Sequence, residues 1–166
     1  MFPLFPYERY GIGFPGLDLM KRTSLATGDD RFAAVAWQQA NIQAAKLGDT
    51  ALAQQLNTAK MDNSPFRFPT FWPHDIDWAP DHNWGGSGMI GLQEMVMQTH
   101  SLPGQPGKIR ILPAWPSAWD VDFKLHAPQQ TVIEGTLVSG HLEKLTVTPE
   151  PRMRDVQILR AKPRPL

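Results

Sequence analysis

Apolar residues recur at helical spacing through the front of the chain, with small alanines between them that let helices approach closely. This pattern predicts three helices, at residues 17–27, 31–49 and 50–61. Asp29 or Asp30 can cap the second helix, and Gly48 followed by Asp49 ends it and caps the third. The second and third helices are therefore expected to form a helical hairpin.

A further helical pattern runs from Gly85 to His100. Its apolar residues are spread around most of the circumference, and they are Met89, Ile90, Leu92, Met95, Val96 and Met97. A helix that is apolar nearly all round is usually buried, so we expect an inner helix. Glu94 lies on it, and because a buried glutamate needs a partner, its expected role is a structural hydrogen bond.

The back of the chain changes to a period of two. The stretch "VDFKLHA" alternates apolar and polar residues, "TVIEGTLVSGHLEKLTVTP" predicts two strands joined at Ser139–Gly140, and "DVQIL" predicts a last strand. These strands are expected to form a small antiparallel sheet. Trp115 and Trp119, in "LPAWPSAW", are expected to pack where the helices meet it.

The predicted fold class is α+β, with a helical domain over residues 1–104 and an antiparallel β-domain over residues 105–166. Such helices and strands carry more apolar surface than a chain of 166 residues obviously covers by itself. We therefore expect a piece of something larger, completed by a preceding part or by another chain.

Charge and composition exclude several partners. Lysine plus arginine equals aspartate plus glutamate, at 16 each, so no net field attracts nucleic acid or an acidic membrane surface. The basic tail Arg160, Lys162, Arg164 is interpreted as a solvated end. Cysteine is absent, which excludes disulfides and thiolate metal sites, and we expect no cofactor. The sequence shows neither an apolar run of about 18 residues nor an export signal.

The segment at residues 62–84 is rich in proline and aromatic residues, which predicts an ordered loop without regular structure. Its imidazoles and carboxylates, at His74, Asp75, Asp77, Asp81 and His82, match no metal-binding motif, and no metal site is expected. Its tryptophans are suited either to a platform for sugar rings or to plain packing.

Asp81 and Asn83 stand directly before Gly85–Gly86 and the helical pattern that follows. Glycines there let the backbone turn tightly into the helix, so both polar side chains would be held near a helix start by rigid packing. A carboxylate so placed can orient or deprotonate a water molecule. It can equally cap the helix, and spacing alone leaves both interpretations open.

The stretch "PDHNWGGSGMIGLQEMVMQTH", followed by "KIRILPAWPSAWDVDFKLHA", resembles the C-terminal signature of glycoside hydrolase family 95, the inverting α-L-fucosidases and their α-L-galactosidase relatives. The front segment "RTSLATGDDRFAAVAWQQANIQAAKLGD" is also similar to a helical segment of that family. The resemblance implies that this chain supplies the last helices of an (α/α)6 toroid and the small β-sandwich or sheet that follows it. It also implies a glycan substrate and a periplasmic or extracellular location.

Specific roles follow from the same resemblance. The family's aspartate, which activates the attacking water, falls on Asp81, and its asparagine falls on Asn83; the acid is a glutamate from earlier in the family's chain. Trp78, His82 and Trp84 would line the sugar subsite. His82 replaces the family's usual glycine and Trp84 its usual phenylalanine, which predicts a different pocket wall and a substrate that can be another L-sugar.

We expect no turnover from residues 1–166 by themselves. The alternative is a non-catalytic carbohydrate-binding or structural fragment that keeps the hydrolase scaffold, with another chain completing it.

Overall fold

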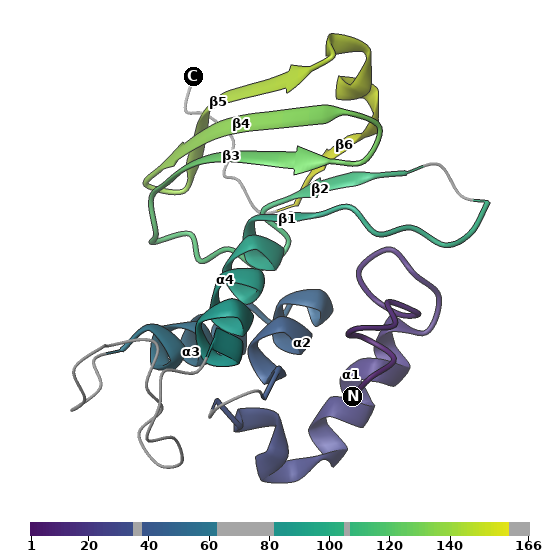
Figure 1. Ribbon diagram of the computed structural model, residues 1–166, viewed down its shortest axis with the longest axis vertical. Helices are drawn as coiled ribbons and strands as arrows, with labels where there is room; N and C mark the ends of the chain where they lie inside the picture. The colour runs from purple at the N-terminus through teal and green to yellow at the C-terminus, as the bar shows by residue number, and fades with distance from the viewer. Residues whose placement is uncertain (35–37, 63–81, 105–106, 160–166) are drawn as a thin grey trace.

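The computed structural model describes residues 1–34, 38–62, 82–104 and 107–159. Helices form the lower part of the molecule in Figure 1 and two three-stranded sheets form the upper part, which confirms the predicted α+β class. The helices are α1 (Leu17–Ala26), the 3-10 helix η1 (Gly28–Phe32), α2 (Ala40–Leu47), α3 (Thr50–Met61), α4 (His82–Val96) and the 3-10 helix η2 (Glu150–Asp155). The strands are β1 (Met97–Gln98), β2 (Ile109–Ile111), β3 (Val121–Ala127), β4 (Thr131–Val138), β5 (His141–Thr148) and β6 (Val156–Ile158).

The predicted hairpin of α2 and α3 is present. Gly48 ends α2 in the left-handed region at φ 71°, where a side chain would be strained. The Asp49 carboxylate then caps α3 by accepting the Leu52 backbone N–H at 3.2 Å. The hairpin is therefore fixed by the two residues that the sequence indicated.

The prediction that α2 begins near residue 31 is wrong, because it begins at Ala40. Residues 28–32 form the separate turn η1, which begins at Gly28 with φ 58°. Neither Asp29 nor Asp30 caps α2, whose N-cap position is Gln39 without a side-chain hydrogen bond. Ala33, directly after η1, is extended at φ −68° and ψ 110°, so helical geometry is interrupted there, which periodicity alone does not register.

Helix α4 packs on α2 and α3 through one face, whose middle consists of small residues, and several of its large apolar residues face outward. The buried face carries Trp84, Ser87, Gly88, Gly91 and Met95. Three apolar side chains that were expected to be buried are exposed instead: Met89 at 58%, Ile90 at 39% and Leu92 at 36%. The expectation of a helix buried all round is therefore wrong, because only one face of α4, which carries Trp84, Met95 and the small residues between them, contacts α2 and α3.

Gly91 allows the closest approach of α4 to the helical hairpin. The Asn41 side-chain amide donates to the Asn57 side-chain oxygen at 3.1 Å and to the Ser87 carbonyl at 2.8 Å. A Cβ at Gly91 would overlap Asn41 Nδ2 and Asn57 Oδ1. The asparagine pair therefore occupies the space that any other residue at this position would need.

Strands β3, β4 and β5 form an antiparallel sheet, as predicted. The turn between β4 and β5 has positive φ at both central residues, 51° at Ser139 and 82° at Gly140, as two-residue hairpins prefer. Along β4 the alternation places Ile133 and Leu137 in the core. Gly135 leaves room for the ring of Phe123, its register partner on β3.

The last predicted strand does not join that sheet, so this part of the prediction is wrong. Strand β6 pairs in parallel with β2, and β2 pairs antiparallel with β1 (Figure 1). Strand β1 continues directly from α4, so the helix enters this mixed sheet without a loop. Strands of two or three residues carry no alternating pattern, and β1 and β2 were therefore missed.

One buried cluster joins the helices to the strands. It includes residues such as Leu56 on α3, Met95 on α4 and Ile133 on β4. The cluster therefore contains residues from both sides of the predicted domain boundary at 104/105. The boundary itself stays a prediction. At the junction the Trp115 indole N–H donates to the Trp119 carbonyl at 2.9 Å, and the two rings meet edge to face at 5.5 Å. Their predicted packing role is confirmed.

Among the helices of the described ranges, none has the length and apolarity to cross a membrane.

Replacing Gly91 by alanine should lower the free energy of unfolding by about 1–3 kcal/mol, because the new methyl group must displace the Asn41–Asn57 pair. Gly86→Ala on the same helix is the matched control. Among the described residues outside its own helix, no atom lies within 4 Å of its added Cβ, so the better helix propensity of alanine should stabilise the chain by about 0.5–1 kcal/mol. Urea denaturation of the two variants measures the difference, and equal stabilities would contradict the packing described for α4.

Candidate functional site

Of the residues named by the sequence motif, the structure describes those that begin α4. His82 and Asn83 belong to the first turn of the helix, Asn83 with an exposed side chain. Trp78, Asp81 and the side chain of His82 lie outside the described residues, as do His74, Asp75 and Asp77 of the metal interpretation. The assigned roles of Asp81, Asn83, Trp78 and His82 therefore stay predictions.

Trp84 anchors the first turn of α4 to the end of α3. Its side chain is 4% exposed, and its indole N–H donates to the Lys60 carbonyl at 2.7 Å. The Lys60 ammonium lies 4.9 Å from the centre of the Trp84 ring, within the range of a cation–π contact. Packing is the role that these contacts show, and a contribution of Trp84 to a sugar subsite stays a prediction.

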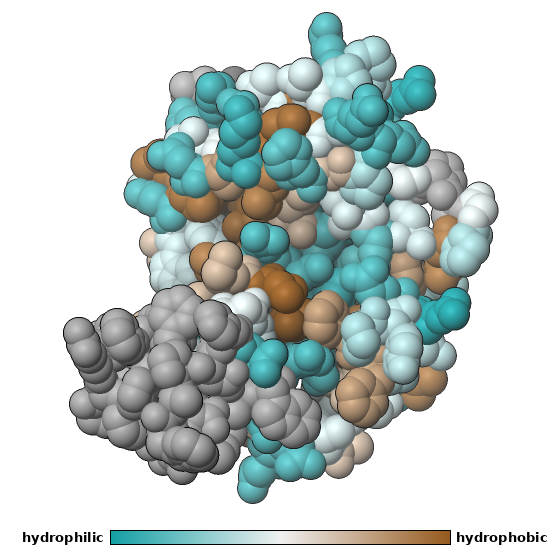
Figure 2. Space-filling view, in the orientation of Figure 1, coloured by the Kyte–Doolittle hydropathy of each residue, from teal (hydrophilic) through white to brown (hydrophobic). Residues whose placement is uncertain are grey.

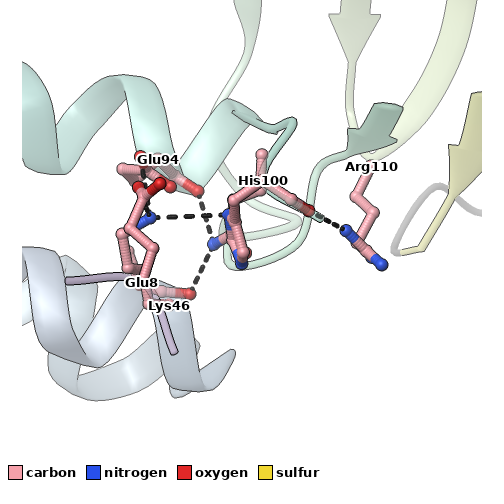
Figure 3. A network of polar contacts seen from close by, with 7 residues as sticks. Glu8, Lys46, Glu94, His100 and Arg110 are labelled. Atoms are coloured by element: carbon pink, nitrogen blue, oxygen red, sulfur yellow. Dashed lines mark hydrogen bonds and ion pairs between the residues drawn. The ribbon is translucent and has the colours of Figure 1, made fainter. Parts of the chain in front are cut away.

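The strongest polar cluster of the described residues lies at the other end of α4, around Lys46 (Figure 3). The Lys46 side chain is 0% exposed. Its ammonium contacts Glu8 Oε1 at 2.8 Å, Glu94 Oε1 at 3.1 Å and His100 Nδ1 at 3.5 Å. These three contacts match the three N–H donors of an ammonium group. The expected structural role of Glu94 is confirmed.

The contact with Lys46 determines the tautomer of His100. An ammonium group has no acceptor, so Nδ1 of His100 accepts and the ring proton resides on Nε2. Burial, reinforced by the positive charge of Lys46, lowers the pKa of His100 from 6.5 to about 4. The imidazole is therefore neutral at pH 7. It also packs edge to face on Phe14, with ring centres 5.1 Å apart.

Burial also governs Glu94. It raises the pKa of this carboxyl above its ordinary value, although the charge of Lys46 and its hydrogen bond act in the opposite direction. Glu94 borders a cavity of about 420 Å³ whose other polar side chains include Thr99, Lys124 and His126. Structural ion-pair networks and catalytic sites both perturb pKa values, and here Oε1 of Glu94 pairs with the Lys46 ammonium.

The cluster connects four segments of the chain. Glu8 comes from the N-terminal segment, Lys46 from α2, Glu94 from α4, and His100 from the residues after β1. Lys46 and Glu8 were missed by the sequence analysis. Lys46 lies one helical turn after the buried Ile42, so its position on an inward face was detectable from spacing, whereas nothing in the sequence pairs it with Glu8.

Within residues 1–34, 38–62, 82–104 and 107–159, no group of three histidine, aspartate or glutamate side chains is arranged to hold a metal ion. Comparison with protein-family models and with curated proteins finds no match to this sequence. The resemblance to glycoside hydrolase family 95 therefore rests on the motifs alone.

The His100 imidazole should make the chain sensitive to acid. Since its pKa is lower in the folded state, its contribution to stability is complete above pH 6.5 and is lost as the pH falls through about 4, a loss of about 3 kcal/mol. His100→Gln, which retains an acceptor for Lys46, should be less sensitive over this interval. Urea denaturation from pH 7.5 to 4 measures the difference.

Glu94 has the opposite effect on how stability depends on pH. Because its pKa is raised in the folded state, it stabilises the folded state in acid, and this contribution is lost as the pH rises. Comparing variant with wild type therefore isolates the imidazole. His126→Gln, which removes an exposed imidazole from β3, is the matched control. Parallel pH curves for the wild type and His100→Gln would contradict the assignment of a buried neutral His100.

Proposed function

We propose that this chain is the C-terminal part of an inverting exo-glycoside hydrolase that acts on α-L-fucosyl or related α-L-glycosyl linkages. The observation that carries the proposal is the sequence Asp81–His82–Asn83, followed by Trp84 and two glycines, at the beginning of α4. A catalytic carboxylate must be held by rigid surroundings. Helix α4 meets this requirement, because Trp84 fixes its first turn and Gly91 its middle.

Each residue has a chemical role in this proposal. Asp81 accepts a proton from a water molecule as the water oxygen attacks the anomeric carbon, and Asn83 orients that water. The bond from the anomeric carbon to the leaving oxygen breaks, and that oxygen receives a proton from a second carboxyl group about 6.5–9.5 Å from the first. The second carboxyl group would be a glutamate outside this chain. Trp78, His82 and Trp84 would border the sugar.

The outward face of α4 supports a larger helical array. Met89, Ile90 and Leu92 are exposed on it, and Met61, at the end of α3, is exposed beside Gly88. Figure 2 shows apolar side chains at the surface in the middle of the molecule, where Figure 1 draws α4. We propose that α1 to α4 are the last helices of an (α/α)6 toroid, whose other helices would cover this face. A preceding part of the protein or another chain would supply them.

The test compares residues 1–166 with the protein that includes any coding sequence upstream of Met1, using an aryl α-L-fucoside and an aryl α-L-galactoside. We expect no turnover from residues 1–166, and hydrolysis with inversion at the anomeric carbon from the longer protein, detected by NMR of the first product. Asp81→Asn should lower kcat by about 10²–10⁴-fold, the contribution of a general base. Asp29→Asn, the same change on an exposed turn, is the matched control.

Two outcomes would contradict the proposal. One is hydrolysis that Asp81→Asn leaves unchanged. The other is a longer protein that hydrolyses no α-L-glycoside but still binds glycans after Asp81→Ala, which would favour the non-catalytic carbohydrate-binding alternative.

A further inference from the structure

A cavity of about 480 Å³ lies between the N-terminal segment, the residues after β1, and strands β2 and β6. This volume is in the range of small-molecule sites, about 300–1,000 Å³. Its polar lining consists of Ser101, Lys108, Arg110 and Gln157, and Phe14 contributes an aromatic wall. Ser101 follows the C-terminal end of α4, so the cavity is at the opposite end of that helix from Asp81. An inference about it does not rest on the proposed hydrolase activity.

Arg110 is held firmly at the base of this cavity. It is the central residue of β2, and its register partners are Gln98 on β1 and Gln157 on β6, so the three side chains leave the sheet on the same face. Arg110 is only 6% exposed, and its Nη1 donates to the His100 carbonyl at 3.1 Å (Figure 3). That bond uses one of the five N–H donors of a guanidinium group.

The cavity is positively charged. Lys108 and Arg110 line it, and among the described residues no aspartate or glutamate does. Across the described ranges, no ion pair joins Lys108 or Arg110 to a carboxylate. A buried guanidinium without an anionic partner is uncommon, since burial of a charge is costly unless it is paired. An anion bound in the cavity would compensate the charge of Arg110.

Gly13 closes one side of the cavity around Arg110. Its φ is +83°, in the region that favours glycine, and a Cβ there would overlap Nη2 of Arg110. The backbone at Gly13 thus lies close to the guanidinium group, and this close approach limits the positions that the group can take. The positive group is both held and oriented, as a binding site requires.

We propose that this cavity binds an organic oxyanion, a carboxylate, sulfate or phosphate group carried on a compact polar body such as a sugar acid. The planar guanidinium of Arg110 suits two oxygens of one such group, and Lys108 supplies a second positive charge. The Ser101 hydroxyl and the Gln157 amide are hydrogen-bonding groups for the polar body. The Phe14 ring offers it an apolar face.

The test is a titration of ¹⁵N-labelled residues 1–166 followed by amide chemical shifts, with sodium glucuronate, sodium sulfate, sodium phosphate and glucose as separate probes at constant ionic strength. We expect saturable shifts at Gly13, Ser101 and Gln157 with glucuronate, and none with glucose. Saturation by sulfate or phosphate with equal affinity would also support the site and would identify the bare oxyanion as the group that is recognised.

Charge-removing variants complete the test. Arg110→Gln should weaken glucuronate binding about tenfold or more, since a charged hydrogen-bonding partner is lost. Lys108→Gln should weaken it by a smaller factor and leaves the Arg110–His100 contact intact, so it keeps the test valid if Arg110→Gln does not fold. Lys144→Gln, the same change on an exposed position of β5, should leave binding unchanged. The proposal is overturned if no anion gives saturable shifts at these amides, or if binding persists unchanged in Lys108→Gln.

Discussion

The arrangement of the helices depends on the contacts that the buried ammonium group of Lys46 makes. A buried charge must be compensated, and Lys46 is compensated by groups from segments that are far apart in the sequence: Glu8, Glu94 and His100. Each of its three N–H donors is directed to a different segment. The N-terminal segment, α2, α4 and the chain after β1 therefore have one mutual arrangement that satisfies this ammonium group.

The packing of α4 is the second constraint, and it acts together with the first. Gly91 brings α4 close to the asparagines of the hairpin, and Trp84 holds its first turn against α3. The helix is thus fixed at three points along its length: Trp84 near the start, Gly91 in the middle and Glu94 near the end. This is the support that the proposed base, Asp81, would need directly before the helix. The same packing directs Met89, Ile90 and Leu92 outward, which agrees with the proposal of additional helices around this chain.

Local patterns predicted the parts of the fold that local physics determines. Period-two alternation and a Ser139–Gly140 turn identified the β3–β5 sheet, and Gly48–Asp49 identified the end of α2 and the cap of α3. The rest depends on contacts between distant residues. The buried face of α4 could not be derived from hydropathy, because its determinants are glycines that fit around an asparagine pair. Strands β1 and β2 are too short for a pattern, and β6 was predicted as a strand but not its parallel pairing with β2.

The candidate sites divide in the same way. Asp81 and its neighbours were found from a motif, and their assignment stays a prediction. The Lys46 cluster and the Arg110 cavity were not found, because a lysine or arginine in the sequence gives no sign of which segments will surround it. A buried charged side chain indicates a site only when the structure shows which groups surround it. For Lys46 they are two carboxylates, whereas for Arg110 the described residues provide a carbonyl, and the proposed anion would supply the opposite charge.

The most direct test of the central role of Lys46 is a double-mutant cycle with Lys46→Met, Glu94→Gln and both, measured by urea denaturation at pH 7. Lys46→Met alone should destabilise the chain by about 3–5 kcal/mol, because it leaves a buried carboxylate unpaired. The double variant should be less destabilised than the sum of the single variants by more than about 1 kcal/mol. The exposed Lys124–Glu134 pair is the control and should show little coupling. Additivity of Lys46→Met and Glu94→Gln within about 0.5 kcal/mol would contradict the account.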